Sequence, residues 1–560
     1  MNNPKIFVLK RYDHDSYHQM HSIQTNKELI SYVFIIYLII NFISSGGHTD
    51  LWDGMVTFLI TESMALKQTA QLDPEIPTVS NTSIPVMINS FLHYEVENNK
   101  IITGKYYEWV SMSKPIEPVY TSRALLLPAI SVPFYLLSTI LSVNPVSLVA
   151  FSVNSIIIAL TSLVIFCFTL DLYGSKRIAF ILGIIFTGCT FILPYNTSLF
   201  PQPLQALCIV SGVFFLYKAR HNRPSFICLF TRGLDTSRTQ TAYIHCGLAG
   251  LFFGLSIFAS PTSGLYLPGF VICAFIYLRQ NKKLILCFLL TLGALLILAG
   301  VVNYMRFGSF TEFGYGSQYG NLSLNTGWTG LYGLLLSPGK GLLFYFPPIV
   351  LLPLAFIFSY RQNKGLSFIT IYVLGVAWLY FGTIDINGGS RFWSGAIAWG
   401  PRYLIPTLPL VVIMLGGLLK YPRKPKTKRV VNISLISTCV AAFVVNLGGI
   451  LVWTEYGLIY GFENERLGSG AEEITTWDPK YSPIVLHMKM LYEDYVSDIP
   501  VQDYKNTGWG YATYGLAPCQ YDLYILCKFG IVPFVVLSGV AVFLSTLILK
   551  RDRNRRLVYS

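Results

Sequence analysis

The sequence predicts an all-α fold: a polytopic transmembrane helix bundle with about twelve spanning helices, outward loops and a small outer segment near the C-terminus. Of the 560 residues, 53% are hydrophobic and 12% are charged, about half the charged fraction of a typical soluble domain. The apolar residues gather into runs of roughly 17 to 23 residues, the length of helix that crosses a hydrocarbon core of about 30 Å. The alternating runs of about ten residues that mark a membrane barrel are not visible.

The apolar runs give the predicted helices in chain order. Backbone amides in lipid must be satisfied within their own segment, so each run is expected to be a helix. The first run follows a polar segment of 28 residues and has no small-residue cleavage site, so it predicts a retained helix instead of a signal peptide. The predicted spans cover roughly residues 29–45, 147–170, 178–194, 204–218, 241–259, 262–278, 283–303, 341–359, 366–383, 403–420, 430–452 and 529–549.

A further apolar stretch, 124–142, decides the topology. If it does not span, the basic clusters between the helices fall on the same side as the N-terminus, and that side carries 27 Lys and Arg against 6 Asp and Glu. The opposite side then carries 14 Lys and Arg against 22 Asp and Glu. This distribution obeys the positive-inside rule. We therefore expect 124–142, which contains Pro128 and Pro133, to be re-entrant or interfacial, with both termini cytoplasmic.

This topology divides the chain into three parts. Residues 1–452 form a transmembrane module with outer loops 46–123, 304–340 and 382–402, residues 453–528 form an outward-facing loop domain, and residues 529–560 form a final transmembrane helix with a basic cytoplasmic tail. The positive-inside rule accounts for the formal net charge of +13, and no nucleic-acid partner is expected. The cysteines form no CxxC motif and the histidines are scattered, so we expect no metal site and no cofactor. Cys519 and Cys527 lie near an outer face and are candidates for pairing.

The first outer loop opens with the block Gly46-Gly47-His48-Thr49-Asp50-Leu51-Trp52-Asp53-Gly54 at the membrane surface. Apolar residues then recur at helical spacing, which predicts an interfacial amphipathic helix. Asp50 and Asp53 are three residues apart and share one face if both are helical. They are either functional carboxylates or an N-cap and a solvated loop acid, and the sequence alone leaves both alternatives open.

Cations on the outer side run against the positive-inside bias. The loop after Gly382 is rich in Gly and Trp and carries Arg391 and Arg402. Each arginine is either a snorkelling anchor at the headgroups or a ligand for an anion, because a guanidinium matches phosphate geometry. The same two alternatives apply to the other outer cations near membrane boundaries, which are Lys114, Arg123, Arg306 and Lys340.

Several blocks resemble one family. Asp53-Gly54 follows the first span and Lys114-Pro115 leads into the proline-containing stretch. Ser337-Pro338-Gly339-Lys340-Gly341 and Trp399-Gly400-Pro401-Arg402-Tyr403 come later. Together they resemble the GT-C superfamily of prokaryotic membrane glycosyltransferases that use phospholipid-carried sugars, and within it a branch related to the protein O-mannosyltransferases and the lipid A aminoarabinose transferases. The resemblance covers about residues 30 to 490.

The resemblance implies a GT-C-like hexosyl- or pentosyltransferase with its active site between the first loop and the helix bundle. It implies inverting transfer from a polyprenyl-phosphate-linked sugar to a glycan, lipid or protein acceptor, at the outer face of a bacterial or archaeal plasma membrane. The family's first-loop aspartate matches Asp53 as general base, with Asp50 as the less favoured substitute. Residues assigned to the leaving phosphate are Arg402, Arg391 and Lys114, and the other substrate-binding candidates are Tyr403, Asn387 and Lys340.

The chemistry of such a transfer agrees with this residue set. A phosphate leaving group carries its own charge and needs no protonation, whereas a glycosidase needs two carboxylates. One aspartate as base and a few cations at the level of the lipid headgroups would therefore suffice.

Two other functions stay open at this point. A lipid or glycan transporter or flippase predicts ionisable residues buried in the middle of the bilayer, and the predicted spans contain almost none. A non-catalytic membrane scaffold that presents 453–528 to partners predicts that Asp53 and Arg402 do not share a cleft. A separation of more than roughly 20 Å between these two residues would exclude the enzyme.

Overall fold

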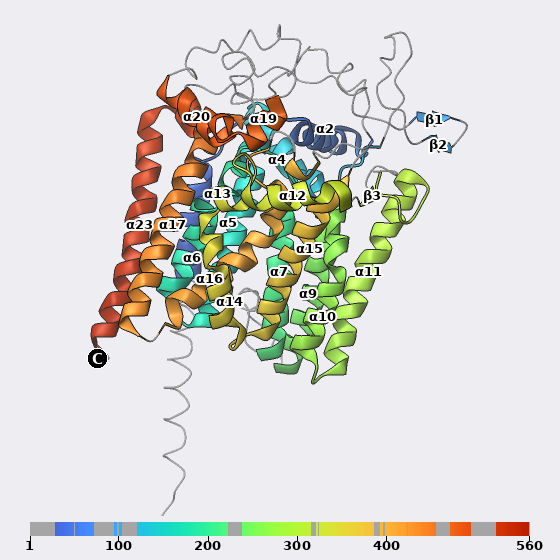
Figure 1. The fold of residues 1–560 in the computed structure, drawn as a ribbon. Coiled ribbons are helices and arrows are strands. Elements are labelled where there is room, and N and C mark those ends of the chain that lie inside the picture. The colour runs from blue at the N-terminus through green and yellow to red at the C-terminus, as the bar shows by residue number, and fades with distance from the viewer. Residues whose placement is uncertain are drawn as a thin grey trace, which may run out of the picture.

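The computed structural model is a bundle of roughly aligned helices with a layer of shorter helices across one end (Figure 1). It describes residues 28–49, 51–71, 95–97, 100–102, 120–221, 238–314, 321–322, 324–385, 392–395, 398–422, 424–454, 471–493 and 522–558, and the structural statements below concern these residues. We call the end that carries α2 (Leu51–Lys67), α19 (Ala471–Trp477) and α20 (Pro483–Tyr492) the capped end. The opposite end is called the basic end.

The predicted multi-pass helix bundle is confirmed. Eight helices are long and apolar enough to cross a membrane, judged by length and composition: Pro145–Tyr173, Thr239–Ala259, Pro261–Leu278, Lys282–Phe307, Lys364–Thr383, Arg402–Lys420, Pro425–Leu451 and Ile531–Leu549. The four remaining predicted spans coincide with shorter or less apolar helices, which are Glu28–Ile43, α6 (Lys176–Gly188), α7 (Gln202–His221) and Pro347–Tyr360.

Figure 1 labels the bundle helices in chain order. Besides α6 and α7 they are α5 (Pro145–Tyr173), α9 (Arg238–Ala259), α10 (Leu267–Leu278), α11 (Lys282–Phe307), α14 (Leu352–Tyr360), α15 (Lys364–Thr383), α16 (Leu408–Lys420), α17 (Pro425–Leu451) and α23 (Ile531–Val558). The shorter elements include α4 (Leu126–Leu141), α12 (Leu324–Leu336), α13 (Leu342–Tyr345), α22 (Tyr524–Phe529) and the 3-10 turns η1 (Leu193–Asn196), η2 (Pro261–Tyr266), η4 (Pro347–Leu351), η5 (Phe392–Ser394), η6 (Arg402–Thr407) and η8 (Pro479–Tyr481).

Capping residues encode the tight reversals at the basic end. Gly174 ends α5 with a φ of 66°, a conformation that favours glycine. Ser175 then begins α6 by accepting a hydrogen bond from the backbone N–H of Ile178. Asn281 and Asn363 cap α11 and α15 in the same way. Because these side chains satisfy amides that a helix end leaves unpaired, neighbouring helices reverse direction within a few residues.

The apolar stretch 124–142 forms α4, a helix of 16 residues with Pro133 inside it. Its buried residues Leu127 and Tyr135 pack in one cluster with Phe58 of α2 and Val149 of α5. Figure 1 places α4 close to α2 at the capped end. That α4 is re-entrant or interfacial stays a prediction, because sixteen residues are short for a span.

Two small antiparallel sheets accompany the helices. Strand β1 (Glu95–Glu97) pairs with β2 (Lys100–Ile102) within the first loop. Strand β3 (Asn321–Leu322) pairs with β4 (Ile384–Asp385), with Asn321 opposite Asp385. This second sheet joins two of the predicted outer loops, 304–340 and 382–402, at the same end of the bundle.

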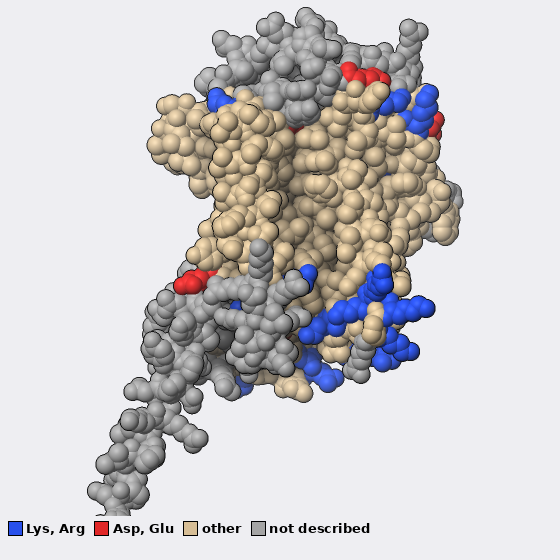
Figure 2. Space-filling view, turned by 90° about the vertical axis from the view of Figure 1, so that its left-hand side faces the viewer, with Lys and Arg blue, Asp and Glu red and all other residues tan. Residues whose placement is uncertain are grey.

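Charged side chains separate along the bundle as the topology predicts. Figure 2 shows Lys and Arg gathered at the basic end, beyond a broad uncharged band. The exposed cations of the helix connections at this end include Arg279, Lys283, Arg361, Lys364, Lys420 and Arg429. The rule that positive charge stays inside predicts that this end faces the cytoplasm and the capped end faces outward. Cys527 in α22 is disulfide-bonded, which is typical of an oxidising compartment; Cys519 lies outside the described residues.

The outermost helices present apolar side chains to their surroundings. α11 and α23 lie on opposite flanks of the bundle (Figure 1). Leu290 and Ile297 of α11 are 64% and 70% exposed, and Val532 and Phe543 of α23 are 68% and 61% exposed. Continuous apolar faces of this kind are expected to contact lipid acyl chains.

Candidate functional site

Helix α2 carries the candidate site at the capped end. Asp53 lies in its first turn, where the partial positive charge of a helix N-terminus favours a carboxylate. The hydroxyl of Thr57 donates to the backbone carbonyl of Asp53 at 2.7 Å. The hydroxyl of Thr61 likewise donates to the backbone carbonyl of Thr57 at 2.9 Å. Phe58 and Ile60 are buried. Packing against α4 and α5 therefore fixes the direction in which the Asp53 side chain leaves the helix.

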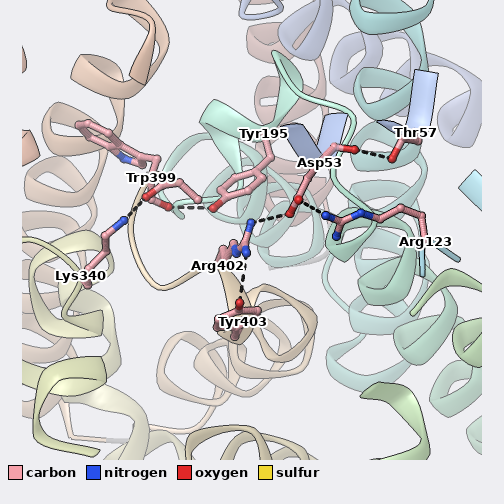
Figure 3. Close-up of polar contacts among 9 residues, drawn as sticks. Asp53, Thr57, Arg123, Tyr195, Lys340, Trp399, Arg402 and Tyr403 are labelled. Atoms are coloured by element: carbon pink, nitrogen blue, oxygen red, sulfur yellow. Dashed lines mark hydrogen bonds and ion pairs between the residues drawn. The ribbon is translucent and has the colours of Figure 1, made fainter. Parts of the chain in front are cut away.

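Two arginines from distant parts of the sequence hold the Asp53 carboxylate (Figure 3). The Nη1 of Arg402 donates to Oδ2 of Asp53 at 2.9 Å, and the Nη2 of Arg123 donates to Oδ1. The three side chains are 19%, 12% and 30% exposed for Asp53, Arg402 and Arg123. These three side chains carry two positive charges and one negative charge, and they keep partial access to solvent.

The arginines also set the ionisation of Asp53. Burial raises the pKa of the Asp53 carboxyl, but the positive charges of Arg123 and Arg402 and their hydrogen bonds outweigh it. The net result holds the pKa of Asp53 below its ordinary value. Because opposite charges within hydrogen-bonding distance favour the charged form, Asp53 is an anion near neutral pH.

Arg402 is held by an aromatic and glycine-lined pocket. Its Nη2 donates to the hydroxyl of Tyr403 at 3.1 Å, and its guanidinium lies 5.3 Å from the ring centroid of Phe200. Gly395 has a φ of +72°, and a Cβ there would lie 2.9 Å from Cγ of Arg402. The ring of Tyr403 stacks on Phe381 at 4.2 Å. The Nε of Arg402 is buried without a hydrogen-bond partner among the described residues.

Arg123 is oriented by a third arginine. Arg306, at the C-terminal end of α11, donates from Nη2 to the backbone carbonyl of Arg123 at 2.8 Å and also to that of Thr121. The Arg306 guanidinium lies 4.6 Å from the ring centroid of Phe307. These bonds tie the segment that precedes α4 to the end of α11, and so place Arg123 against Asp53.

Lys340 lies in a different part of the capped end. Its Nζ donates to the carbonyl of Ala398, and Figure 3 shows it beside Trp399, away from Asp53. The hydroxyl of Tyr195 donates to the carbonyl of Trp399 at 3.0 Å. Lys340 is 4% exposed. Its bond to Ala398 shapes the segment that leads into Arg402; that Lys340 binds substrate stays a prediction.

The structure therefore unites part of the predicted residue set. Asp53, Arg402 and Tyr403 meet in one cluster. Sequence reasoning noted Arg123 and Arg306 only as outer cations. The signal that could have selected them is the one used for Arg402, a cation at the outer membrane boundary against the positive-inside bias. The remaining predicted residues lie outside the described residues, and these are Asp50, Lys114, Asn387 and Arg391.

A second buried carboxyl on α2 is separate from this cluster. The hydroxyl of Tyr135 donates to Oε1 of Glu62 at 3.0 Å, and Oε2 has no hydrogen-bond partner among the described residues. Burial raises the pKa of the Glu62 carboxyl, and the Tyr135 hydrogen bond only partly offsets it. Glu62 follows Asp53 by nine residues, two and a half turns of a helix. The two carboxyls therefore point to different faces of α2.

Comparison with known proteins gives distant structural similarity. No protein-family model matches the sequence, and a comparison with curated proteins gives no match. Among solved structures, the chain is similar to a crystal structure of ArnT from Cupriavidus metallidurans bound to undecaprenyl phosphate, with 12% identity, 86% of this chain and 80% of that chain covered, and a TM-score of 0.45. The apo state of the same protein gives 13% identity, coverage of 94% and 78%, and a TM-score of 0.44. At TM-scores below 0.5 such likenesses do not establish a family or an activity.

Proposed function

We propose that this protein is a membrane glycosyltransferase that moves a sugar from a polyprenyl-phosphate donor to an acceptor hydroxyl at the outer membrane face. The observation that carries the proposal is the contact of Asp53 with Arg402 and Arg123. A carboxylate able to accept a proton and two guanidinium groups able to bind a phosphate lie within one hydrogen-bonded cluster. This is the pairing of groups that displacement of a phosphate from a sugar requires.

The reaction follows from the roles of these groups. The oxygen of the acceptor hydroxyl attacks the anomeric carbon while the Asp53 carboxylate takes the hydroxyl proton. The bond between the anomeric carbon and the phosphate oxygen breaks, and its electron pair stays on the phosphate. The polyprenyl phosphate leaves as an anion that the guanidinium groups stabilise. A single displacement of this kind inverts the anomeric configuration.

For Asp53 to act as a base, binding of the sugar donor must release it from its ion pairs with the arginines. The Asp53 carboxylate accepts hydrogen bonds from both arginines, and a carboxylate paired in this way is a weak base. A phosphate can accept two parallel hydrogen bonds from one guanidinium, whereas Arg402 gives Asp53 one such bond. We infer that the donor phosphate takes over these N–H groups, which frees an Asp53 oxygen to face the acceptor and raises its proton affinity.

The position of the site along the membrane normal is the one expected for the phosphate of a lipid carrier. Tyr304 and Met305, which immediately precede Arg306, are 54% and 73% exposed on α11, and Trp328 of α12 is 77% exposed. Exposed aromatic side chains at helix ends are typical of the membrane–water interface. Since Arg306 bonds the carbonyl of Arg123, the cluster lies near the level of these residues, where the phosphate of a lipid carrier resides.

The two alternative functions fit the structure less well. A scaffold predicts that Asp53 and Arg402 lie apart, whereas their side chains are 2.9 Å apart. An ion-coupled transporter predicts carboxylates midway along the spans. Within the eight candidate spans Asp171 is the sole Asp or Glu, and it lies near the end of α5 in contact with Lys218.

The finer roles follow from the same assignment. Arg402 and Arg123 hold the leaving phosphate, and the Tyr403 hydroxyl orients Arg402 or contacts the carrier. Lys114 and Arg391 are proposed as further phosphate ligands, Asn387 and Lys340 as further substrate-binding residues, and Asp50 as the substitute base.

The test is rescue of glycan transfer in cells that lack the gene. The cells receive wild type, Asp53→Asn or Glu62→Gln at matched expression, and surface glycans are profiled by mass spectrometry. Glu62→Gln is the control because it neutralises a buried carboxyl of the same helix outside the cluster. We expect wild type and Glu62→Gln to restore one glycan and Asp53→Asn to lower its transfer about 10²- to 10⁴-fold. Full rescue by Asp53→Asn would refute Asp53 as the base.

A further inference from the structure

A buried histidine–aspartate pair lies beside the site and joins the two ends of the sequence. The Nε2 of His48 lies 2.7 Å from Oδ1 of Asp522. Both residues are almost fully buried, at 0% and 2% exposure. His48 precedes Asp53 by five residues, and Asp522 lies two residues before the start of α22, near the C-terminus.

The pair explains the two glycines that open the first outer loop. A Cβ on Gly46 would lie 2.8 Å from Oδ1 of Asp522, and a Cβ on Gly47 would lie 2.0 Å from the ring of Tyr524. The backbone N–H of Tyr524 also donates to the carbonyl of Ser45 at 2.8 Å. The segment 522–524 therefore docks directly on the backbone of 45–48, which only glycine permits at these positions.

Residues 45–48, on which the segment 522–524 packs, are connected to Asp53 through the chain. Only two residues separate His48 from the start of α2, and Asp53 lies in the first turn of that helix. Gly54 packs on Leu199: a Cβ added to Gly54 would lie 3.5 Å from the backbone nitrogen of Leu199. A shift of 45–48 would therefore move the N-terminus of α2 and the carboxylate that it carries.

Residues 45–48 are also connected to the surroundings of Arg402. The Oγ of Ser45 lies 3.0 Å from the carbonyl oxygen of Phe151 and 2.9 Å from that of Asn196, so its one O–H hydrogen lies between these two acceptors. Asn196 belongs to the turn that leads to Phe200, whose ring lies 5.3 Å from the Arg402 guanidinium. Residues 45–48 thus connect both to α2, which carries Asp53, and to the turn that precedes Phe200, whose ring lies against Arg402.

The pair also closes the base of the outer segment 453–522. The backbone N–H of Asp522 donates to the carbonyl of Leu451 at 3.1 Å. The ring of Trp453 lies 4.7 Å from the His48 ring. The first and last residues of this segment therefore meet on His48.

Stability alone gives a weak reason for such a pair. Desolvation of two charged groups costs about as much as their attraction returns, so buried pairs often add little to the free energy of unfolding. Oδ2 of Asp522 is buried without a hydrogen-bond partner among the described residues, which adds to the unfavourable side. Fixing one arrangement of neighbouring segments is the better-supported use of buried polar pairs.

We propose that His48 and Asp522 are a positioning pair that sets the distance between the Asp53 carboxylate and the Arg402 guanidinium during transfer. The inference rests on the proposed function. Displacement of a catalytic group by about 1 Å can lower a rate on the order of 100-fold, although every residue that touches substrate is intact.

The test compares the isosteric variants His48→Gln and Asp522→Asn, their double variant and Asp53→Asn in the full-length protein. Transfer rate is measured in membranes, per folded molecule, for the glycan that gene deletion removes. Binding of a polyprenyl monophosphate is measured on detergent-solubilised protein. Asp171→Asn is the control, because it breaks a carboxylate–lysine pair at the basic end.

We expect each single variant to lower the transfer rate about tenfold and to change the dissociation constant of the polyprenyl monophosphate less than threefold. The double variant should be no slower than the slower single variant, because the two residues act through each other. Asp171→Asn should keep the wild-type rate.

Unchanged rates in both single variants, while Asp53→Asn is inactive, would overturn the positioning pair and leave the proposed function intact. Multiplying losses in the double variant would overturn it as well. An active Asp53→Asn would instead refute Asp53 as the base, which is the assignment in the proposed function on which the positioning pair rests.

Discussion

Two aspartates at opposite ends of this bundle contact cations in different ways. At the basic end, Asp171 of α5 pairs with Lys218 of α7, and the Lys218 side chain is 6% exposed. At the capped end, Asp53 of α2 contacts two arginines, Arg123 and Arg402, which come from outside α2 and are 30% and 12% exposed. The Asp171–Lys218 pair joins one negative and one positive side chain. The contacts of Asp53 with Arg123 and Arg402 join one negative side chain to two positive ones.

The difference shows which contact can accept a ligand. A neutral pair between two adjacent helices satisfies its own charges and has no electrostatic reason to bind an anion. A cluster with one carboxylate and two guanidinium groups gains from an additional anion, and guanidinium groups bind phosphate in a bidentate manner. We therefore propose that the phosphate binds at the capped end, and that the Asp171–Lys218 contact at the basic end contributes to packing.

After Asp53→Asn, the largest expected effect is that of Arg402→Gln. The variant removes the more buried of the two phosphate-binding groups, and loss of one charge-stabilising donor typically lowers a rate 10²- to 10³-fold. We expect a loss of this size in transfer rate, measured in membranes that contain equal amounts of folded protein. Arg402→Lys should recover only part of it, since an ammonium cannot form the bidentate contact. Wild-type activity in Arg402→Gln would remove the capped end from the mechanism.

A smaller effect is expected from Arg306→Gln. Arg306 donates to the backbone carbonyls of Thr121 and Arg123, and it is not among the proposed ligands of the phosphate. Its loss should therefore loosen Arg123 and leave those ligands in place. We expect a decrease in transfer rate of about tenfold, which is the size of a modest misplacement. The Arg123→Gln, Arg306→Gln double variant is the check. It should be no slower than Arg123→Gln alone if Arg306 acts through Arg123.

The pH dependence should separate the free enzyme from the substrate complex. Because its pKa is lowered in the folded protein, the Asp53 ion pair is complete above the unfolded carboxyl pKa of about 4 and is lost only below it. The acid limb of kcat/KM, which reports free enzyme, should therefore lie below pH 4.

The kcat profile offers the contrast. With a donor phosphate on the arginines, the pKa of Asp53 should rise, so the acid limb of kcat should lie at higher pH than that of kcat/KM. Arg123→Gln should move the kcat/KM limb upward, because it removes one of the charges that lower the pKa of Asp53. If the acid limbs of kcat and kcat/KM lie at the same pH, the donor phosphate does not replace Asp53 as the partner of the arginines.

The smallest effect on transfer is expected from Lys218→Gln at the basic end. Removal of one partner leaves the Asp171 carboxylate poorly compensated, so thermal unfolding should show a loss of about 3 kcal/mol in stability. The transfer rate per folded molecule should change less than twofold. A rate loss comparable to that of Arg306→Gln would show that the two ends are coupled and that the contrast between them is incomplete.

Two residues of this site, Asp53 and Arg402, were predicted from local features of the sequence. Asp53 stood out because it opens an amphipathic helix directly after the first span, and Arg402 because it is an arginine at the outer end of a span. Both signals are local: they follow from helix periodicity and from the energetic cost of placing charge near lipid. The choice between a catalytic carboxylate and a helix N-cap had no local solution, because it depends on what faces the side chain.

The sequence by itself determined the helix bundle, because runs of apolar residues of spanning length have one stable form in lipid. Its basic clusters also determined which helix ends lie together. Only the tertiary structure decided that Arg123 and Arg402, 70 and 349 residues from Asp53 in the chain, meet on one carboxylate. It also decided that His48 meets Asp522, 474 residues away. Contacts of such separation depend on how helices of similar composition pack, and hydrophobic periodicity carries no record of which neighbour each polar side chain faces.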